Sequence, residues 1–510
     1  MHAFRSIGSR IVPSVIGVTL LGLHTGAAYA QNKSPAETAA VELPGPSQSL
    51  FANPFYVCRR TYYVAPDGKD ANPGTQSAPW ATLRHADIGA GGRIAGDCVD
   101  VAPGTYPAGV AITRGGNLAA ASGYVVYRCE ILDKCKITAS GGNAQPAFNI
   151  NMMEADPDYI VIDGFEMAAS SETAYGVGVL INNNPVGGPK ARLSAHHVWI
   201  INNIVHGYGE GGIGADEADW VFLLHNTVYD NAHVTCDAQG SGIGLVVAKS
   251  VQDYELTAAD RAWAPFHQVI AWNISHDNAL TKCGNAQSPY DTDGNGIILD
   301  TFNGSGVDNV PYQDQTLVAD NITYNNGGGG IHVFRTSHAT VANNTSYNNN
   351  LDPWNRGFPR GEISNAGGTF NTYINNIAYA MPAISVADIR CQGAKYDMAP
   401  DPCPLMGNVA FFGGDGAGVK DANNVWSNNI SFGGSPPWGW GPRGNALVDH
   451  DSMSCTSNLC NVDPLLADPK RGNFALRASS PAIAYGKPQK YLSSQAVDAG
   501  ACFHAANDCP

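Results

Sequence analysis

The sequence predicts an all-β solenoid in which short coils of chain stack on one another, and three observations support this. A pattern of apolar-x-x-Asn-apolar, followed by Tyr or His, returns throughout residues 198–377. A second pattern, Gly followed by Ile within two residues, returns between its copies. Both are short β runs without helical periodicity, and their recurrence indicates stacked repeats. The chain also has 58 Gly and only 14% charged residues, which suits a turn-rich β solenoid.

The first pattern supplies one strand of each coil. The step from Asn203 to Asn226 equals the step from Asn321 to Asn344, and the longer steps are interpreted as the same unit with an insertion. Inward asparagines at successive turns can bond amide to amide and amide to backbone, which satisfies buried polar groups. We therefore predict a structural ladder of the aligned asparagines: Asn203, Asn226, Asn273, Asn321, Asn344 and Asn376.

The second pattern supplies a strand whose two faces carry different residues. Its aligned isoleucines are expected to point inward: Ile213, Ile243, Ile297, Ile331 and Ile363. Because side chains alternate along a strand, residues at odd offsets from these isoleucines then point outward, and further charged residues lie at the strand ends. The expected outward patch contains Asp216, Lys249, Asp300, His332 and Arg335, with Glu217 beside it and with Arg360 and Glu362 extending it by one coil.

This patch has the chemistry of a polysaccharide-cleaving site. Asp216 and Asp300, two coils apart, are expected about 9–10 Å from each other at strand spacing, close to the carboxylate separation of inverting glycosidases. His332 can act as acid or base near neutral pH, and Arg335 can hold a carboxylate or sulfate through two hydrogen bonds. Catalytic candidates are Asp216, Asp300, His332 and Arg335; substrate-binding candidates are Glu217, Lys249, Arg360 and Glu362. The alternative for each is a solvated surface charge.

Long insertions interrupt the middle coils. They fall at 250–266, 279–292, 301–314 and 350–361, and they carry Tyr254, Trp263, Tyr290, Tyr312 and Trp354. Loops that project from one region of a solenoid commonly wall a cleft. Aromatic rings there can stack against sugars, which makes Trp263 and Trp354 further substrate-binding candidates. The alternative is that these rings pack the loops onto the coils.

The run 291–296 is a candidate metal turn. It begins like an EF-hand loop, but the twelfth position is Phe302 instead of Glu, which excludes an EF-hand. A calcium-binding turn through Asp291 and Asp293 is the remaining hypothesis, and the alternative is an Asp/Gly turn that enters a strand.

The ends of the chain indicate export. Arg5 and Arg10 precede a short apolar run, and Ala28-Tyr29-Ala30 is a small-x-small cleavage site, so residues 1–30 are predicted to be a signal peptide. Residues 31–57 are predicted to be a disordered linker, and residues 58–510 to be the solenoid domain. The protein is therefore expected to be secreted or periplasmic. The 12 Cys fit an oxidising compartment. Expected local disulfides join Cys129 with Cys135, Cys391 with Cys403, Cys455 with Cys460, and Cys502 with Cys509.

The net charge of −15 argues against nucleic acid or an anionic membrane as a partner. A polysaccharide, expected to be acidic, would need a local cationic patch or a bound metal, and a monomer is expected.

The first segment of the domain, 62–106, reads YYVAPDGKDANPGT, then PWATL, then GDCVDVAPGTY. A strand at Tyr62–Val64 and a short helix around 79–86, which would cap the open end of the solenoid, are expected there.

This opening, together with 462–483 and 497–500, resembles the pectate-lyase-like superfamily of secreted proteins. The resemblance implies a single-stranded right-handed parallel β-helix with an N-terminal capping helix and long loops on the middle coils. The run GNGIILD at 294–300 is similar to the motif that bears the catalytic lysine of family 9 pectate lyases, but Ile298 occupies the lysine position. An aspartate run one coil earlier is also missing, so the resemblance implies different chemistry on the same face.

Three functions remain open at this point. The first is a lyase that cleaves a uronic-acid-containing polysaccharide by β-elimination, with His332 or Lys249 as base and with Arg335, Lys249 or calcium neutralising the uronate. The second is an inverting hydrolase that uses Asp216 and Asp300. The third is a non-catalytic carbohydrate-binding β-helix.

Overall fold

The computed structural model describes most of the domain that the sequence predicts. The described residues are 58–117, 123–140, 145–151, 157–169, 176–182, 195–232, 240–250, 265–278, 293–304, 310–351, 361–380, 410–414, 419–433, 455–489, 497–502 and 509. The expected signal peptide and linker lie outside them. No helix within these ranges is long and apolar enough to cross a membrane.

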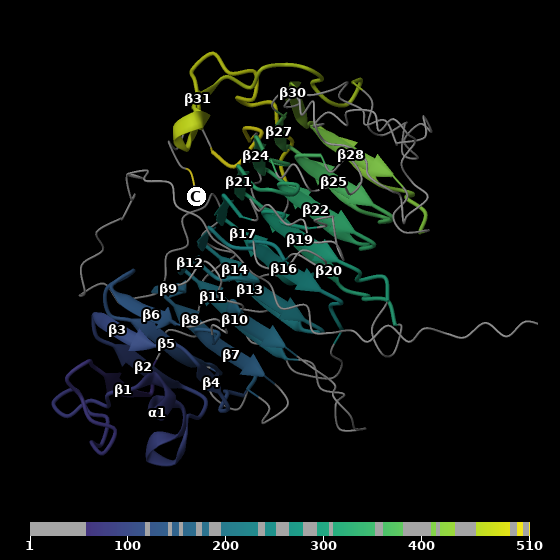
Figure 1. Ribbon diagram of the computed structural model, residues 1–510. Coiled ribbons are helices and arrows are strands. Elements are labelled where there is room, and N and C mark those ends of the chain that lie inside the picture. Colours follow the sequence, from purple (N-terminus) through teal and green to yellow (C-terminus); the bar gives the residue numbers. More distant parts are fainter. Residues whose placement is uncertain are drawn as a thin grey trace, which may run out of the picture.

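The chain winds through three long parallel sheets, and each coil adds one strand to each sheet (Figure 1). The first sheet consists of β1 (Arg60–Val64), β2 (Asp97–Val101), β5 (Val125–Cys129), β8 (Ile160–Asp163), β11 (His196–Ile201), β14 (Asp219–Leu224), β17 (Phe266–Ala271), β20 (Gln315–Ala319), β23 (Ala339–Ala342), β26 (Thr372–Ile374) and β29 (Val425–Ser427). The second consists of β3 (Gly104–Pro107), β6 (Cys135–Ala139), β9 (Phe165–Ala169), β12 (Ile204–His206), β15 (Thr227–Tyr229), β18 (Ile274–His276), β21 (Ile322–Tyr324), β24 (Thr345–Tyr347), β27 (Ile377–Ala380) and β30 (Ile430–Gly433). The third consists of β4 (Val110–Ile112), β7 (Phe148–Asn151), β10 (Val177–Asn182), β13 (Gly211–Asp216), β16 (Ile243–Val246), β19 (Ile297–Asp300), β22 (Ile331–Phe334), β25 (Ile363–Ala366) and β28 (Phe411–Gly414).

This architecture is the right-handed parallel β-helix that the sequence predicts. Its N-terminal end is covered by α1 (Leu83–Ile88), followed by the short turn η3 (Gly89–Gly91). The Thr82 side chain caps α1 by accepting a hydrogen bond from the His85 backbone N–H. Buried Asp87 anchors α1 to the first coil by accepting hydrogen bonds from the backbone and side chain of Thr113. The C-terminal segment contributes β31 (Leu466–Asp468), η4 (Pro469–Arg471) and β32 (Asn473–Leu476), where β31 and β32 pair antiparallel.

The asparagine ladder is confirmed. Each backbone N–H of the series donates to the Oδ1 of the next asparagine at 2.9–3.1 Å, from Asn203 through to Asn376. The same ladder continues to Asn429 and Asn458. A second ladder, at the turn between the second and third sheets, runs through Asn231, Asn278, Asn326 and Asn349. The ladders satisfy polar groups inside the coils, so these asparagines are structural.

Local disulfides also form as predicted. Bonds join Cys129 with Cys135, Cys455 with Cys460, and Cys502 with Cys509, while Cys391 and Cys403 lie outside the described residues. An unpredicted disulfide joins Cys58 to Cys98 at the start of the domain. Their sequence separation of 40 hides this pair from a search for neighbouring cysteines, because strand pairing between β1 and β2 brings them together.

Candidate active site

The predicted register of the third sheet is confirmed. Asp216 aligns with Val246 of the next coil, and Val246 aligns with Asp300 of the coil after that. The inward isoleucines of these strands are buried in the core, as are Ala215 and Leu299, which directly precede Asp216 and Asp300. Asp216 and Asp300 are partly exposed and end their strands. The two carboxylates therefore stand in one row on the outer face, two coil spacings apart, or about 9–10 Å between Cα atoms.

His332 lies in a parallel row on the same face. It aligns with Ile298 on one side and with Ser364 on the other. The Ser364 hydroxyl lies 2.7 Å from His332 Nδ1, and the imidazole also stacks on Phe334 with ring centroids 5.9 Å apart. These contacts hold the ring in place, which is a requirement for a side chain that transfers a proton in a defined direction.

Strand spacing divides the patch into two pairs that share Asp300. Asp300 and His332 are diagonal neighbours on adjacent strands, about 7–8 Å apart. Asp300 and Asp216 are about 9–10 Å apart. Asp216 and His332 are separated by three coils as well as two residues, about 16 Å, so they cannot act on the same glycosidic bond. The expected single centre is therefore two alternative centres, one on each side of Asp300.

Asp216 has an unusual protonation equilibrium. Burial raises its pKa to about 7, with further contributions from the neighbouring charges of Glu217 and Asp300. A carboxyl group with this pKa keeps its proton near neutral pH and can serve as a general acid. Burial likewise raises the pKa of Glu210 to about 7. The sequence analysis missed Glu210, because its position just before β13 indicates neither its burial nor its distance from other charges.

Two of the predicted binding residues interact with each other. The Lys249 ammonium lies 3.7 Å from a carboxylate oxygen of Glu217, whose side chain is only 10% exposed. The Lys249 ammonium is therefore held in an ion pair, which makes it a weaker candidate for a base than His332. Arg335 follows β22 in a left-handed backbone conformation with φ 46°. Its backbone N–H donates to Ala366, and its neighbour Phe334 aligns with Asp300, which places Arg335 at the end of the Asp300 row.

The prediction that Glu362 lies on the outer face and binds substrate is wrong. Glu362 is fully buried and its carboxylate accepts hydrogen bonds from the Asn349 backbone N–H and from Asn349 Nδ2. It also accepts one from the Ser346 hydroxyl. Glu362 thus ends the second ladder in place of a further asparagine. The two-residue alternation failed here because Glu362 lies in the turn before β25, outside the regular strand.

The loop residues divide between packed positions and positions outside the described residues. Tyr312 is 3% exposed, packs edge-on against Phe302 with centroids 5.4 Å apart, and donates to Asp219. For this ring the packing alternative is correct. The remaining loop candidates lie outside the described ranges: Trp263, Trp354, Arg360, Asp291, Tyr254 and Tyr290.

The calcium turn stays a prediction. Of its two residues, only Asp293 is described. Within the described ranges, one group of three or more metal-ligating side chains is close enough to hold an ion, and Asp293 is not part of it. That group consists of Asp219, His267 and Asp314 on the first sheet, and the sequence analysis missed it because the three residues are far apart in the chain.

Comparisons with known proteins concern the fold. No family model matches the chain, and no curated protein matches it in sequence. Among solved structures, pectate lyase Pel9A has 17% identity and a TM-score of 0.46, over 87% of this chain and 96% of that one. A complex of XylC with xylose has 14% identity and a TM-score of 0.41, over 73% and 76% of the two chains. A rhamnogalacturonan lyase has 16% identity and a TM-score of 0.39, over 72% and 87%. Similarity at this level does not say what this chain binds.

Proposed function

We propose that the protein cleaves an acidic polysaccharide by β-elimination on the outer face of the third sheet. The observation that carries this proposal is the alignment of Asp300 with the strand end that bears Arg335, with His332 diagonal to Asp300 on the same face. A base and a cation thus flank one carboxylate. The chain carries a net charge of −15, so a polyanion would need such a local cation to approach.

Elimination assigns a task to each of these residues. The Arg335 guanidinium pairs with the uronate carboxylate, which makes the neighbouring C5 proton more acidic. His332 removes that proton, the electron pair forms the C4–C5 double bond, and the glycosidic oxygen on C4 leaves and takes up a proton. Asp300 stabilises the imidazolium that forms on His332. His332 aligns with Ile298 of the preceding coil, and Ile298 occupies the lysine position of the family that the sequence resembles. His332 therefore places a basic side chain in the same outward row, one coil later.

One observation favours hydrolysis as a second candidate. Asp216, with a pKa of about 7, would protonate the leaving oxygen, and Asp300 would activate a water molecule. Their separation, about 9–10 Å between Cα atoms, suits an inverting mechanism, in which water lies between the acid and the base. This centre uses the other side of Asp300 and does not need His332.

Product analysis distinguishes these candidates. The full-length exported protein, with its disulfides formed, would be incubated with a panel of uronic-acid-containing and neutral polysaccharides. Ultraviolet absorbance of the unsaturated uronate is expected together with new reducing ends, and His332→Ala is expected to remove both. New reducing ends without that absorbance, lost in Asp216→Asn and retained in His332→Ala, would establish hydrolysis instead. Saturable binding without new ends would indicate a non-catalytic carbohydrate-binding protein.

We further propose that the protein works outside the cytoplasm and that the 291–293 turn binds calcium during catalysis. The disulfides within the described residues support the first statement, since such bonds persist in oxidising compartments. For the second, activity lost to a chelator should return with Ca²⁺. Activity indifferent to the chelator would remove calcium from the scheme.

A further inference from the structure

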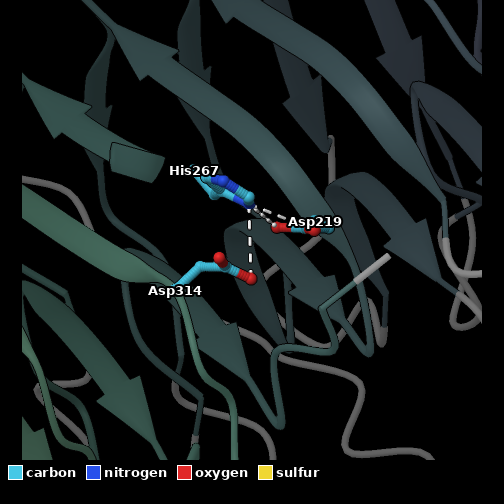
Figure 2. Close-up of side chains that lie close together, drawn as sticks. All are labelled: Asp219, His267 and Asp314. Atoms are coloured by element: carbon cyan, nitrogen blue, oxygen red, sulfur yellow. Dashed lines mark hydrogen bonds and ion pairs between the residues drawn. The ribbon is translucent and has the colours of Figure 1, made fainter. Parts of the chain in front are cut away.

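A second polar cluster lies on the first sheet, formed by Asp219, His267 and Asp314 (Figure 2). Asp219 begins β14, His267 is the second residue of β17, and Asp314 directly precedes β20, so each comes from a different, successive coil. One ligand atom from each residue lies within 4.8 Å of the other two. The proposed reaction does not use this cluster.

Distances within the cluster are too long for strong hydrogen bonds. His267 Nδ1 lies 3.3 Å and 3.4 Å from the two Asp219 oxygens and 3.4 Å from Asp314 Oδ2. Charge-assisted N–H···O bonds are about 2.7–2.9 Å long, and one N–H cannot point at three oxygens at once. A tetrahedral ion with bonds of about 2.0–2.1 Å holds its ligand atoms about 3.3–3.4 Å apart. The distances from His267 to the two carboxylates therefore match ligand spacings around a tetrahedral ion, and the third spacing, between the two aspartates, is within 4.8 Å.

The surroundings hold these side chains in orientation. The His267 ring stacks on Trp220 with centroids 3.8 Å apart. Strand pairing shifts register between Phe266 and Gln268, and an irregularity of this kind re-aims the side chain that it contains, here His267. Figure 2 shows the imidazole nitrogen directed at both carboxylates. The ring is thus held in a ligating pose by packing, independently of any contact within the cluster.

Asp219 has the support expected of a metal ligand. Its side chain is fully buried, and Oδ1 accepts hydrogen bonds from the Tyr312 hydroxyl at 2.6 Å and from the Trp220 backbone N–H at 2.9 Å. Donors behind a carboxylate orient it toward a metal. Two carboxylates around one imidazole also leave negative charge that a divalent cation would balance.

We propose that Asp219, His267 and Asp314 form a binding site for a divalent transition-metal ion, best matched by Zn²⁺, that clamps three successive coils. An imidazole ligand disfavours calcium and magnesium, which take oxygen ligands. The coils in question are those that the insertions at 250–266 and 301–314 interrupt. A metal here would join β14, β17 and β20 at the point where each strand begins.

Zinc titration of the metal-stripped protein tests this. The full-length disulfide-bonded chain would be stripped with a chelator, titrated calorimetrically with Zn²⁺ alone, and followed by thermal denaturation. One equivalent of Zn²⁺ per chain and a rise of several degrees in Tm are expected. Co²⁺ in place of Zn²⁺ should produce the visible absorption bands of a tetrahedral site. Absence of saturable Zn²⁺ binding, or Ca²⁺ that competes equally for the site, would overturn the proposal.

Variants locate the bound ion. His267→Gln and Asp314→Asn should each weaken Zn²⁺ binding by about tenfold or more. Asp314 is 28% exposed, so its variant is the safer one if His267→Gln fails to fold. The matched control is His338→Gln, since exposed His338 stands just before β23 on the same sheet, stacked on Phe370. Equal Zn²⁺ affinity in the wild type and in Asp314→Asn would place the ion elsewhere and refute this site.

Discussion

Glu362 and Asp216 are two acidic residues at opposite ends of the third-sheet strands, and their surroundings differ sharply. Glu362 faces the interior, where Asn349 and Ser346, which come before it in the same coil, donate hydrogen bonds to its carboxylate. Asp216 faces outward, where burial raises its pKa to about 7 and the charges of Glu217 and Asp300 add to this rise. Stacking brings corresponding positions of successive coils into register, whatever residues stand there. The buried carboxylate of Glu362 is surrounded by donors and is structural, whereas the largely buried carboxyl of Asp216 has further acids near it and keeps its proton to a higher pH.

The largest expected effect is on the cleavage rate, and it tests the outward-facing acids of this comparison. Asp300 belongs to both candidate centres, so Asp300→Asn should lower the cleavage rate by about 100-fold or more. Thermal stability should change little, because Asp300 is partly exposed at a strand end. The rate would be measured on the best substrate of the polysaccharide panel. Asp277→Asn, in the turn after β18, is the matched control and should retain full activity. A large loss of Tm in Asp300→Asn would make the residue structural.

Glu362→Ala tests whether the buried acid of this comparison stabilises the fold. Removing the carboxylate takes the acceptor from the buried Asn349 backbone N–H and from one bond of Asn349 Nδ2, at about 1–3 kcal/mol for each group left unsatisfied. The free energy of unfolding, measured with denaturant, should fall by about 3 kcal/mol or more. Glu130→Ala, at an exposed position, should change it little. A Glu362→Ala protein that keeps its stability but loses substrate affinity would restore Glu362 as a binding residue.

A smaller effect follows from the raised pKa of Asp216. The folded value of about 7 lies above the ordinary 3.8, so the folded state holds an extra proton between these pH values. Stability should therefore fall as pH rises from about 4 to 7. Glu210, also raised to about 7, contributes in the same direction. Asp216→Asn should make the dependence of Tm on pH shallower, and adding Glu210→Gln should flatten it further. An unchanged slope in the double variant would contradict the assignment.

The smallest expected effect is that of substituting Lys249, which pairs with Glu217 beside Asp216. Its ion pair with Glu217 is long, at 3.7 Å, so Lys249→Met should cost no more than about 1 kcal/mol of stability. A modest rise in KM for an acidic substrate, with kcat unchanged, would show that Lys249 still attracts the polyanion. Lys470→Met, in η4, is the control. A fall in kcat as large as that of Asp300→Asn would make Lys249 a catalytic residue instead.

Repetition explains which parts of the molecule were predictable from sequence. Each coil repeats the same local rules, so the asparagine ladder, the inward isoleucines and the outward row from Asp216 to Asp300 could be read from aligned patterns. Neighbouring cysteines, such as Cys129 and Cys135, pair for the same local reason. Predictions failed at turns and insertions, where no alternation applies. Glu362 was placed outside although it lies inside, and Tyr312 was expected at a cleft although it packs in the core.

The sequence by itself determined the stacked-coil architecture and the face on which Asp300 and His332 lie, because strand alternation and coil repeat are local and periodic. Only the tertiary structure decided which side chains meet across coils. It separated Asp216 from His332, joined Cys58 to Cys98, and gathered Asp219, His267 and Asp314 from strands far apart in the chain. Insertions of unequal length set those distances in sequence, whereas the constant spacing of stacked strands sets the distances in space.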